Sequence, residues 1–550
     1  MTNTILTLLS AERLREHHRD GFWRDDTIYA AARRHAEAAP GAFALRDRGR
    51  RLSYRDALAA ADALADDLAA RGVRPGQRVA VWLPSRVETA VALLACSRAG
   101  FVCCPSLQRD HTVADIVGLI ARMRAAALIA QPGYGADADR HDIFAAARDV
   151  ASVRHVYRVA PDHAGAPFSG LLDGAVGRAP PSADPNHVVY LAFTSGTTGE
   201  PKGVMHSDNT LLANARALAG DWRLGPRSVI YTASPLSHNL GLGALVTALA
   251  VGAELVVHDL ARGASLLDRL RETGASFLFG VPTHAVDLLA ELDARGVERF
   301  DQIEGFRISG AAVAREVVAA LLRRGVVPQS GYGMTETCSH QYTLPDDPPE
   351  RIIETSGRAC PGYEIRIWRQ DDPDVEAAPG EVGQIGGRGA SLMLGYFDDQ
   401  AATEAAFNAH GWFMTGDLGR LDENGYLRVT GRKKDVIIRG GHNIHPARIE
   451  ALAQGHPAVA RAAAFPVADA RLGEKVCVAI VAKPGMAVSG AALLAHLDAA
   501  GLSRFDMPEY FLAVDTMPLT ATGKLLKRAL VDQVRDGRLR PEPVRWERTS

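Results

Sequence analysis

Hydrophobic and polar positions alternate between helical and strand-like periods over the first two thirds of the chain. A helical pattern rich in Ala and Leu covers residues 54–71, and the strand-like run RVAVWL follows it. A second helical pattern over residues 87–98 leads into the strand-like run FVCCP. The same alternation recurs downstream, where a helical pattern follows each of the runs SVIYTASP, AELVVHD, ASFLFGVP and FRISGAA. Because such alternation is typical of parallel sheets covered by helices, we predict a large, multi-layered α/β body.

The pattern changes between residues 353 and 431, where short strand-like runs are separated by Gly, Pro and Asp turns. This region predicts a β-rich subdomain. The polar segment GRKKD at residues 431–435 then follows the strand-like run YLRVT, and the remaining chain has the length and α/β pattern of a small domain. We therefore predict an N-terminal domain over residues 1–430 and a small α+β C-terminal domain over residues 431–550.

Composition and charge exclude several classes of protein. The 550 residues exceed what one core supports, and 47% hydrophobic residues with a net charge of -2 are typical of a globular protein without a nucleic-acid partner. The six cysteines form no CxxC pair, which predicts reduced structural thiols and a cytoplasmic protein. The N-terminal segment does not match a secretory signal. The longest apolar segment, residues 240–257, contains glycines and Glu254, so it predicts a buried helix that leads into a strand rather than a membrane span.

The segment TSGTTGEPKG at residues 194–203 is the first with a chemical signature. It directly follows the apolar run at residues 188–193, which has the length of a buried strand. Glycines allow the backbone N–H groups to turn inward, hydroxyl side chains add donors, and Lys202 supplies a compact cation. The segment lacks the spacing of a Walker A loop but predicts a loop that cradles phosphates. Taken alone, it also fits a polar turn with a solvated lysine.

Four further motifs follow in order along the chain. GYGMTE places Glu336 after a glycine turn, where a carboxylate can hold a magnesium ion that bridges phosphate oxygens. WFMTGD ends in Asp417, whose two acceptor oxygens suit the two ribose hydroxyls, and TGRKKD offers Arg432 near the same sugar. TATGKLLKR puts Lys524 on a glycine turn. Each residue taken singly also fits a turn, a loop cap or a surface charge.

Together, at these positions and in this order, the five motifs resemble the adenylate-forming superfamily of acyl-CoA synthetases, carrier-loading adenylation domains and beetle luciferases. The resemblance covers nearly the whole chain and implies an active site between the large domain and a mobile C-terminal domain. Each residue at a motif position is therefore expected to have the role that the family's residue has at that position. The resemblance assigns the ATP site to Thr194, Ser195, Gly196, Thr197, Thr198 and Lys202 at the triphosphate, Gly310, Ala311, Ala312, Tyr332 and Gly333 at the adenine, Thr335 beside them, and Asp417 and Arg432 at the ribose. It makes Glu336 the magnesium ligand.

The family runs two half-reactions in one active site. A carboxylate attacks the α-phosphorus of ATP, and then a thiol attacks the acyl-adenylate and releases AMP. Lys524 matches the family's catalytic lysine, which bridges the acid and the α-phosphate in the first step. Lys434 matches the hinge of the moving domain, and Gly440 and Gly441 match the loop that approaches coenzyme A in the second step.

The resemblance predicts an ATP-dependent carboxylate–CoA ligase that uses ATP, Mg²⁺ and coenzyme A. The alternative from the same family is an enzyme that transfers its acyl group to the phosphopantetheine of a carrier protein. A luciferase-type oxygenase and a nucleotide sensor without turnover are further alternatives, but a sensor would be expected to have lost Lys524 or Glu336. The expected partners are small molecules, with no nucleic acid and no membrane span, and a homodimer is left open.

The segment SPLSHNLGLGALV is the evidence on which carboxylic acid is the substrate. It matches the family element PLxHxxG, and this match implies that His238 lies near the substrate carboxylate as a third catalytic residue. A structural histidine at a strand end is the alternative. No Asp follows His238 at the position that would pair with a substrate ammonium, so an amino acid is disfavoured. The residues expected to line an apolar acyl pocket are Leu240, Gly241, Gly243 and Met334. The N-terminal runs FWRDDTIYAAARRH and SLQRDHTVADI are most similar to ligases for cyclohexanecarboxylate and related alicyclic or short- and medium-chain acids.

Two segments depart from the family pattern, and a pair of histidines in a third has residue types that can bind a metal ion. Arg448 stands where relatives usually have glutamate, and it lies in the moving domain. Ala359 and Cys360 stand in GRACPG, where relatives usually have a proline. His442 and His445 are three residues apart, but no third ligand accompanies them, so we predict no metal site there.

Overall fold

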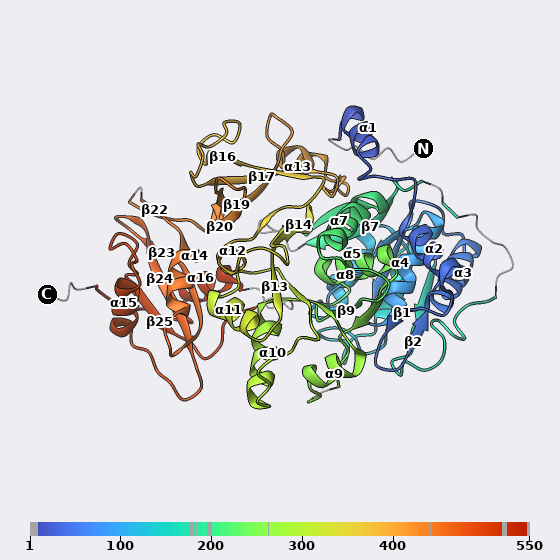
Figure 1. Ribbon diagram of the computed structural model, residues 1–550, viewed down its shortest axis with the longest axis horizontal. Coiled ribbons are helices and arrows are strands. Elements are labelled where there is room, and N and C mark those ends of the chain that lie inside the picture. The colour runs from blue at the N-terminus through green and yellow to red at the C-terminus, as the bar shows by residue number, and fades with distance from the viewer. Residues whose placement is uncertain are drawn as a thin grey trace. The chain divides into compact units, whose positions relative to one another are not determined.

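The computed structural model describes residues 9–174, 181–182, 184–194, 201–261, 263–440, 442–519 and 525–546. The chain forms two compact units, one of residues 1–365 and 387–413 and the other of residues 366–386 and 414–550. Figure 1 shows their helices and strands. The predicted domain boundary after residue 430 falls inside the second unit and stays a prediction.

The first unit contains a seven-stranded sheet whose order is β18-β8-β7-β4-β3-β5-β6. Its strands are β3 (Arg78–Trp82), β4 (Val102–Cys104), β5 (Ala125–Ala130), β6 (His155–Arg158), β7 (Val188–Thr194), β8 (Lys202–Ser207) and β18 (Gly395–Tyr396). The strands from β7 to β6 are parallel, as the alternation of helices and strands predicts. At the other edge, β7, β8 and β18 pair antiparallel.

The second sheet of this unit has nine strands in the order β15-β14-β13-β12-β11-β9-β10-β1-β2. Its strands are β1 (Phe43–Arg46), β2 (Arg51–Ser53), β9 (Val229–Thr232), β10 (Glu254–Val257), β11 (Phe277–Gly280), β12 (Gly305–Ile308), β13 (Val327–Met334), β14 (Cys338–Tyr342) and β15 (Arg358–Ala359). The pairing is parallel from β13 to β1. It is antiparallel at both ends, where β1 meets β2 and where β13, β14 and β15 follow one another.

Helices form three layers around these two sheets. One apolar core joins both sheets through α2 (Ile28–Ala38), α3 (Tyr54–Ala70), α4 (Val87–Ala99), α7 (Asp208–Asp221) and α8 (Asn239–Val251). A second core places α5 (Val113–Arg122) and α6 (Ile143–Ala146) on the outer face of the seven-stranded sheet. A third core places α9 (Leu266–Thr273), α10 (Pro282–Ala294) and α11 (Arg315–Arg323) on the outer face of the nine-stranded sheet. The predicted multi-layered α/β body is therefore confirmed.

The remaining helices of this unit are α1 (Ala11–Arg19), η1 (Ala147–Asp149), α12 (Pro349–Glu354) and α13 (Gln400–Ala405).

The long apolar segment at residues 240–257 is a buried helix followed by a strand, as predicted. Helix α8 ends at Gly252, whose φ of 77° lets the chain turn back into β10. Among the residues that the structure describes, no helix combines the length and the apolar character that a membrane crossing requires. All six cysteines are buried and unpaired, in agreement with the predicted structural thiols.

The second unit consists mainly of two sheets. A four-stranded sheet has the order β16-β17-β19-β20, with β16 (Tyr363–Trp368), β17 (Gly383–Gly389), β19 (Phe413–Leu421) and β20 (Leu427–Arg432). These strands occupy the region predicted to be rich in β-structure. A six-stranded sheet contains β21 (Ile437–Arg439), β22 (His442–Ile444), β23 (Val459–Asp469), β24 (Gly473–Ala482), β25 (Tyr510–Ala513) and β26 (Glu542–Pro543). The apolar cores on its two faces involve α14 (Pro446–Gln454) and α15 (Gly490–Ala499) on one face and α16 (Lys527–Arg535) on the other, and η2 (Lys433–Asp435) precedes β21.

Candidate active site

The predicted phosphate loop connects two antiparallel strands. Thr194 at the end of β7 pairs with Lys202 at the start of β8, and the Thr194 hydroxyl donates to the Lys202 carbonyl at 3.4 Å. Ser195, Gly196, Thr197 and Thr198 lie outside the described residues. The sequence predicted β7 but not β8, because the strand begins inside the glycine-rich motif, where turn residues hide its pattern.

Tyr396 links the two ends of the predicted triphosphate and metal site. The Lys202 ammonium lies 4.7 Å from the centre of the Tyr396 ring, a cation–π contact. The Tyr396 hydroxyl donates to Glu336 Oε1 at 2.9 Å. Burial and the negative charge of Glu336 raise the pKa of Tyr396 far above its usual value, so the phenol stays protonated and remains a donor. Sequence reasoning did not identify Tyr396, because its partners lie about 60 and 190 residues away. The pairing of β18 with β8 brings Tyr396 to the strand of Lys202, and the hydrogen bond from Met393 to the Glu336 carbonyl brings the same segment to Glu336.

The GYGMTE segment forms the tight turn between β13 and β14, where Met334 pairs with Cys338. A Cβ atom at Gly333 would lie 2.0 Å from the Cys338 carbonyl oxygen, so this turn requires glycine. Glu336 follows the turn and is buried, and its carbonyl accepts from the Met393 N–H at 2.7 Å. The backbone of Glu336 is therefore held by the Met393 N–H, and the carboxylate that was predicted to bind magnesium is held by the Tyr396 hydroxyl.

His206 fixes the same turn from the side of β8. Its Nε2 donates to the Thr335 carbonyl at 2.7 Å, and the imidazole is fully buried. Burial lowers the pKa of His206 to about 4, so the ring is neutral near pH 7 and carries its proton on the nitrogen that faces the carbonyl. This histidine, four residues after Lys202, ties the phosphate-loop strand to the segment that carries Glu336.

The predicted adenine segment lies at the end of β12. Gly310 has a φ of 93°, a conformation that favours glycine, and Ala311 and Ala312 are exposed. Tyr332 on β13 is partly buried and meets the His340 ring edge-on at 5.5 Å. Small exposed side chains and one aromatic ring are a combination that suits a flat heterocycle.

The predicted ribose residues are neighbours within the second unit. Asp417 on β19 pairs directly with Arg432 on β20, and Arg432 Nε lies 3.1 Å from Asp417 Oδ1. The Asp417 side chain is 11% exposed, whereas that of Arg432 is 47% exposed. Lys434 follows in η2, where burial and the positive charge of Arg432 lower its pKa. Gly440 has a φ of 57°, and Gly441 lies outside the described residues.

The predicted acid-binding segment begins α8. His238 is the N-cap of this helix, and its Nδ1 accepts from the Leu240 N–H at 3.5 Å. Leu240 is buried. A Cβ atom at Gly241 would lie 2.2 Å from the Pro235 carbonyl oxygen, so glycine at this position allows the helix to pack on the preceding loop. At Gly243 the corresponding space is open, which suits the predicted pocket better.

The predicted catalytic Lys524 lies outside the described residues. The second lysine of the TATGKLLKR motif, Lys527 on α16, is described. Its ammonium lies 2.7 Å from Glu450 Oε1, so Lys527 belongs to an ion pair within the second unit.

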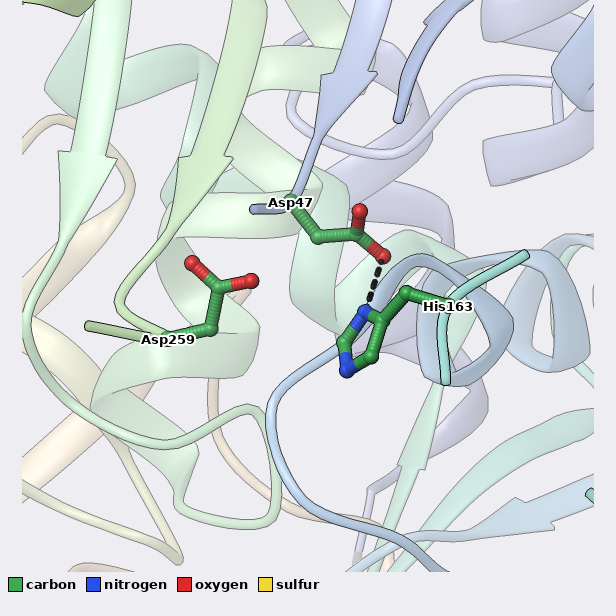
Figure 2. A group of neighbouring side chains, drawn as sticks. All are labelled: Asp47, His163 and Asp259. Carbon is green, nitrogen blue, oxygen red and sulfur yellow. Dashed lines mark hydrogen bonds and ion pairs between the residues drawn. The ribbon is translucent and has the colours of Figure 1, made fainter. Parts of the chain in front are cut away.

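Two groups of side chains consist of residue types that can bind a metal ion. His442 Nε2 lies 2.8 Å from Asp506 Oδ1, and no three-ligand group in the described chain includes His442 and His445. Figure 2 shows Asp47, His163 and Asp259, whose ligand atoms approach one another within 4.8 Å. Asp47 already accepts from the Gly49 and Arg50 N–H groups, from the Arg50 guanidinium and from His163. These donors make the group a charge network that joins loops of the first unit, and they hold the pKa of Asp47 well below its usual range.

Two family models match most of the chain. Residues 32–397 match the family model of the AMP-binding enzymes, and residues 448–524 match the model of the AMP-binding enzyme C-terminal domain. The chain therefore belongs to the family of AMP-binding enzymes. The predicted membership in the adenylate-forming superfamily and the predicted fold of a large body with a small C-terminal domain are confirmed.

Individual relatives extend the comparison. The chain is 30% identical to a medium-chain fatty-acid–CoA ligase of Escherichia coli, over 96% of this chain and 94% of that protein. It is 32% identical to a salicyl-AMP ligase / salicyl-S-ArCP synthetase of Mycobacterium tuberculosis, over 95% and 94% of the two chains. The crystal structure of ATP-bound MatB from Rhodopseudomonas palustris is similar with a TM-score of 0.82 and 28% identity, and the match covers 93% of this chain and 99% of that one.

Proposed function

We propose that the protein is an ATP-dependent carboxylate–CoA ligase, which converts an acid, ATP and CoA into acyl-CoA, AMP and pyrophosphate through an acyl-adenylate. The observation that carries this proposal is the contact series from Lys202 through Tyr396 to Glu336. In a member of the AMP-binding enzyme family, one buried tyrosine thus contacts both a cation, which suits phosphate oxygens, and a carboxylate, which suits a magnesium ion.

In the first half-reaction an oxygen of the substrate carboxylate forms a bond to the α-phosphorus, and the bond from that phosphorus to pyrophosphate breaks. Two anions must approach each other, so positive charge has to be concentrated at the α-phosphate. Lys202 and the hydroxyl groups from Thr194 to Thr198 bind the triphosphate in this proposal, and Lys524 neutralises charge as it develops. Because these groups are positioned in advance, they need no reorganisation in the transition state.

Magnesium fits the residues that are present. Glu336 provides carboxylate oxygens, the ligands that Mg²⁺ prefers, and the ion usually binds one or two carboxylates together with substrate phosphates. When bound, the ion would supply charge neutralisation between phosphate oxygens. The Tyr396 hydroxyl and the Met393 N–H orient the Glu336 residue for that role.

In the second half-reaction the sulfur of CoA forms a bond to the acyl carbon, the bond to AMP breaks, and the thiol proton is lost. We assign the loop around Gly440 and Gly441 to the pantetheine of CoA and Lys434 to the hinge that changes conformation between the two steps. Asp417 and Arg432 hold the ribose in both steps, because AMP stays bound until the thioester forms.

The substrate is proposed to be an alicyclic or short- to medium-chain acid, with its carboxylate near His238. The similarity to a medium-chain fatty-acid–CoA ligase supports this class. So do the small and apolar side chains of the predicted pocket, above all Gly243, where the space for a side chain is open. Leu240 and Met334 complete this pocket in the proposal.

A second function has its own support. The similarity to a salicyl-AMP ligase / salicyl-S-ArCP synthetase is as strong in identity and coverage as that to the CoA ligase. An enzyme of that second kind would form the same acyl-adenylate but would pass the acyl group to a carrier-protein phosphopantetheine in place of CoA.

One experiment separates these functions. The protein is incubated with ATP, Mg²⁺ and a panel of carboxylic acids, with and without CoA, and AMP, acyl-adenylate and acyl-CoA are followed by mass spectrometry. Acyl-CoA that forms only when CoA is added supports the ligase. Acyl-adenylate that persists in the presence of CoA supports carrier loading, and the absence of adenylate with every acid rejects both functions.

A further inference from the structure

Arg307 on β12 is completely buried, and no carboxylate among the described residues pairs with it. Its Nη1 donates to Gln329 Oε1 at 2.6 Å, whereas Nε and Nη2 have no hydrogen-bond partner within the described chain. Burial lowers the pKa of Arg307 to about 10, and the nearby groups that act on it are Tyr342 and Cys360, not a carboxylate. At neutral pH the guanidinium therefore stays charged, and a buried charge without a counterion is unfavourable.

The guanidinium lies directly behind the first glycine of GYGMTE. A Cβ atom at Gly331 would lie 2.7 Å from Arg307 Nη2 and 2.8 Å from its Cζ, so the guanidinium occupies the space that a side chain at position 331 would fill. Gly331 itself is partly exposed. Because residue 331 is a glycine, the Arg307 guanidinium can lie directly against the backbone of the GYGMTE segment, which is predicted to contact the substrate and the nucleotide.

The surrounding side chains lie on one face of the nine-stranded sheet. Arg307 pairs with Gln329 across β12 and β13, and Gly331 pairs with Tyr342 across β13 and β14. Because alternate residues of a strand share a face, these four residues point the same way. Tyr342 belongs to the apolar core that contains α8, and α8 packs against β11 and β14. The Arg307 side of the sheet is therefore the side covered by the helix that begins after His238.

Two more buried polar side chains accompany the arginine. Within the described part of the chain, Gln329 Nε2 has no hydrogen-bond partner. Neither ring nitrogen of His340, which is fully buried on β14, meets full hydrogen-bond geometry there, although the Cys338 backbone acts on the ring. Burial and the charge of Arg307 lower the pKa of His340 to about 3, so this ring is neutral and offers one donor and one acceptor. Together Arg307, Gln329 and His340, here the Arg307 cluster, present an excess of unpaired N–H donors and one positive charge.

We infer that the Arg307 cluster binds a second carboxylate at the far end of the acyl substrate, so that the acid is a dicarboxylic acid. This inference rests on the proposed function and narrows its substrate class. A planar guanidinium whose Nε–Nη2 edge has no partner in the described chain matches a carboxylate through two parallel hydrogen bonds, and the anion supplies a counterion. Ordered water would satisfy the N–H groups but would leave the charge with the Tyr342 ring, whose centre lies 5.2 Å from Arg307 Cζ, and without an anion.

The test compares matched acids. Straight-chain monocarboxylates are paired with the dicarboxylates of equal carbon number, such as pentanoate with pentanedioate and heptanoate with heptanedioate. For the best pair, kcat/KM of adenylation, measured by pyrophosphate exchange, should favour the dicarboxylate by about ten- to hundredfold, the usual range for hydrogen bonds to a charged group. Equal or greater kcat/KM for every monocarboxylate would overturn the inference while the proposed ligase stands.

Variants test whether the preference for the dicarboxylate depends on the Arg307 cluster. Arg307→Met should lower kcat/KM for the dicarboxylate by the same factor and leave that for the monocarboxylate within about twofold, because the remaining contacts are unchanged. Arg307→Lys should recover only part of the preference, since the point charge lacks the planar fork. Arg315→Met on α11 is the matched control, because Arg315 pairs with Glu354 at the surface. An Arg307→Met variant that keeps the wild-type preference would overturn the inference.

A binding measurement serves if Arg307→Met does not fold. Without ATP, the dicarboxylate should raise the melting temperature of the wild-type protein in a concentration-dependent way, and the matched monocarboxylate should not. Equal shifts with both acids would assign the cluster to structural water and reject the inference. Failure to adenylate any acid would reject the proposed function itself.

Discussion

Asp417 and Arg432 lie directly opposite each other on the antiparallel strands β19 and β20, with 3.1 Å between Arg432 Nε and Asp417 Oδ1. The Thr415 hydroxyl accepts from the Asp417 N–H at 3.1 Å and donates to the Ile385 carbonyl at 2.8 Å. The backbone of Asp417 is thus tied through Thr415 to the neighbouring strand β17, and its carboxylate is held by the arginine. Two motifs that are 15 residues apart in the sequence form one site because the hairpin register places them side by side.

Asp417→Asn should weaken ATP binding. The substitution keeps the size of the side chain but removes the charge that accepts two hydroxyl hydrogen bonds, so the KM for ATP should rise by about ten- to hundredfold. Steady-state pyrophosphate exchange with varied ATP measures this effect. Glu423→Gln in the exposed turn of the same hairpin is the control. A KM within twofold of the wild-type value, at about the resolution of such kinetics, would argue against a ribose contact.

Lys524→Ala should lower the rate of adenylation by at least about a hundredfold, by analogy with the removal of one oxyanion donor. Lys527→Ala is a sharp control, because Lys527 lies in the same motif but pairs with Glu450. Pyrophosphate exchange under saturating ATP and acid compares the two variants. Near wild-type exchange in Lys524→Ala would reject the catalytic assignment.

Tyr396→Phe should raise the Mg²⁺ concentration needed for half-maximal activity. The variant keeps the ring beside Lys202 but removes the hydroxyl that orients Glu336. Loss of such an orienting contact typically costs about ten- to hundredfold in metal affinity or activity. Titration of free Mg²⁺ at a fixed ATP concentration distinguishes a metal effect from a general loss of rate, and an unchanged midpoint would contradict the assignment of Glu336.

His206→Gln should flatten the dependence of stability on pH. The folded pKa of His206, about 4, lies below the ordinary value of 6.5, so between these values the unfolded chain binds a proton that the folded chain does not. The stabilisation is fully present above pH 6.5 and is lost as the pH falls toward 4. For this residue the slope is at most about 1.4 kcal/mol per pH unit. Denaturant unfolding of wild type, His206→Gln and the exposed control His410→Gln from pH 4 to 7 checks it, and equal slopes in all three would contradict the prediction.

Lys434→Pro should impair thioester formation more than adenylation. Proline fixes φ at its own position and restricts the residue before it, and both lie in the short helix η2 that follows β20. Separate assays of pyrophosphate exchange and acyl-CoA release measure the two half-reactions. Lys434→Ala is the control for the loss of the ammonium. Equal losses of both half-reactions in the proline variant would show that residue 434 is no hinge.

Much of the fold could be predicted from the sequence because helices and buried parallel strands have strong apolar periods. Helix α3 and strands β3 and β11 occur where the pattern places them. The antiparallel edges were not predicted. Strand β8 starts at Lys202 within a glycine-rich motif, and β14 starts at Cys338 in a turn whose residues carry no strand signal.

Candidate site residues were predicted only where each belongs to a motif. The motifs suggest roles for Glu336, Asp417 and Arg432, which stay predictions, and the structure adds that Asp417 and Arg432 are paired in the β19–β20 hairpin. Tyr396 and His206 act through partners that are distant in the sequence, so no local pattern indicates them. Arg307 is the clearest omission: it lies in an apolar run that predicts a strand, and its burial beside Gly331 depends on the register of two strands.

The antiparallel pairing of β7 with β8 has an electrostatic consequence for the nucleotide. In a strand-to-helix phosphate loop, the positive end of a helix dipole shares the work of attracting anions. Here the motif leads into a second strand, and α7 begins only at Asp208, with an acid at its first position. If the loop binds the triphosphate as proposed, no helix N-terminus directly follows it to attract the anion. The charge of Lys202 then contributes more of the attraction, and dissolved salt screens a side-chain charge near the surface more readily than a buried helix dipole.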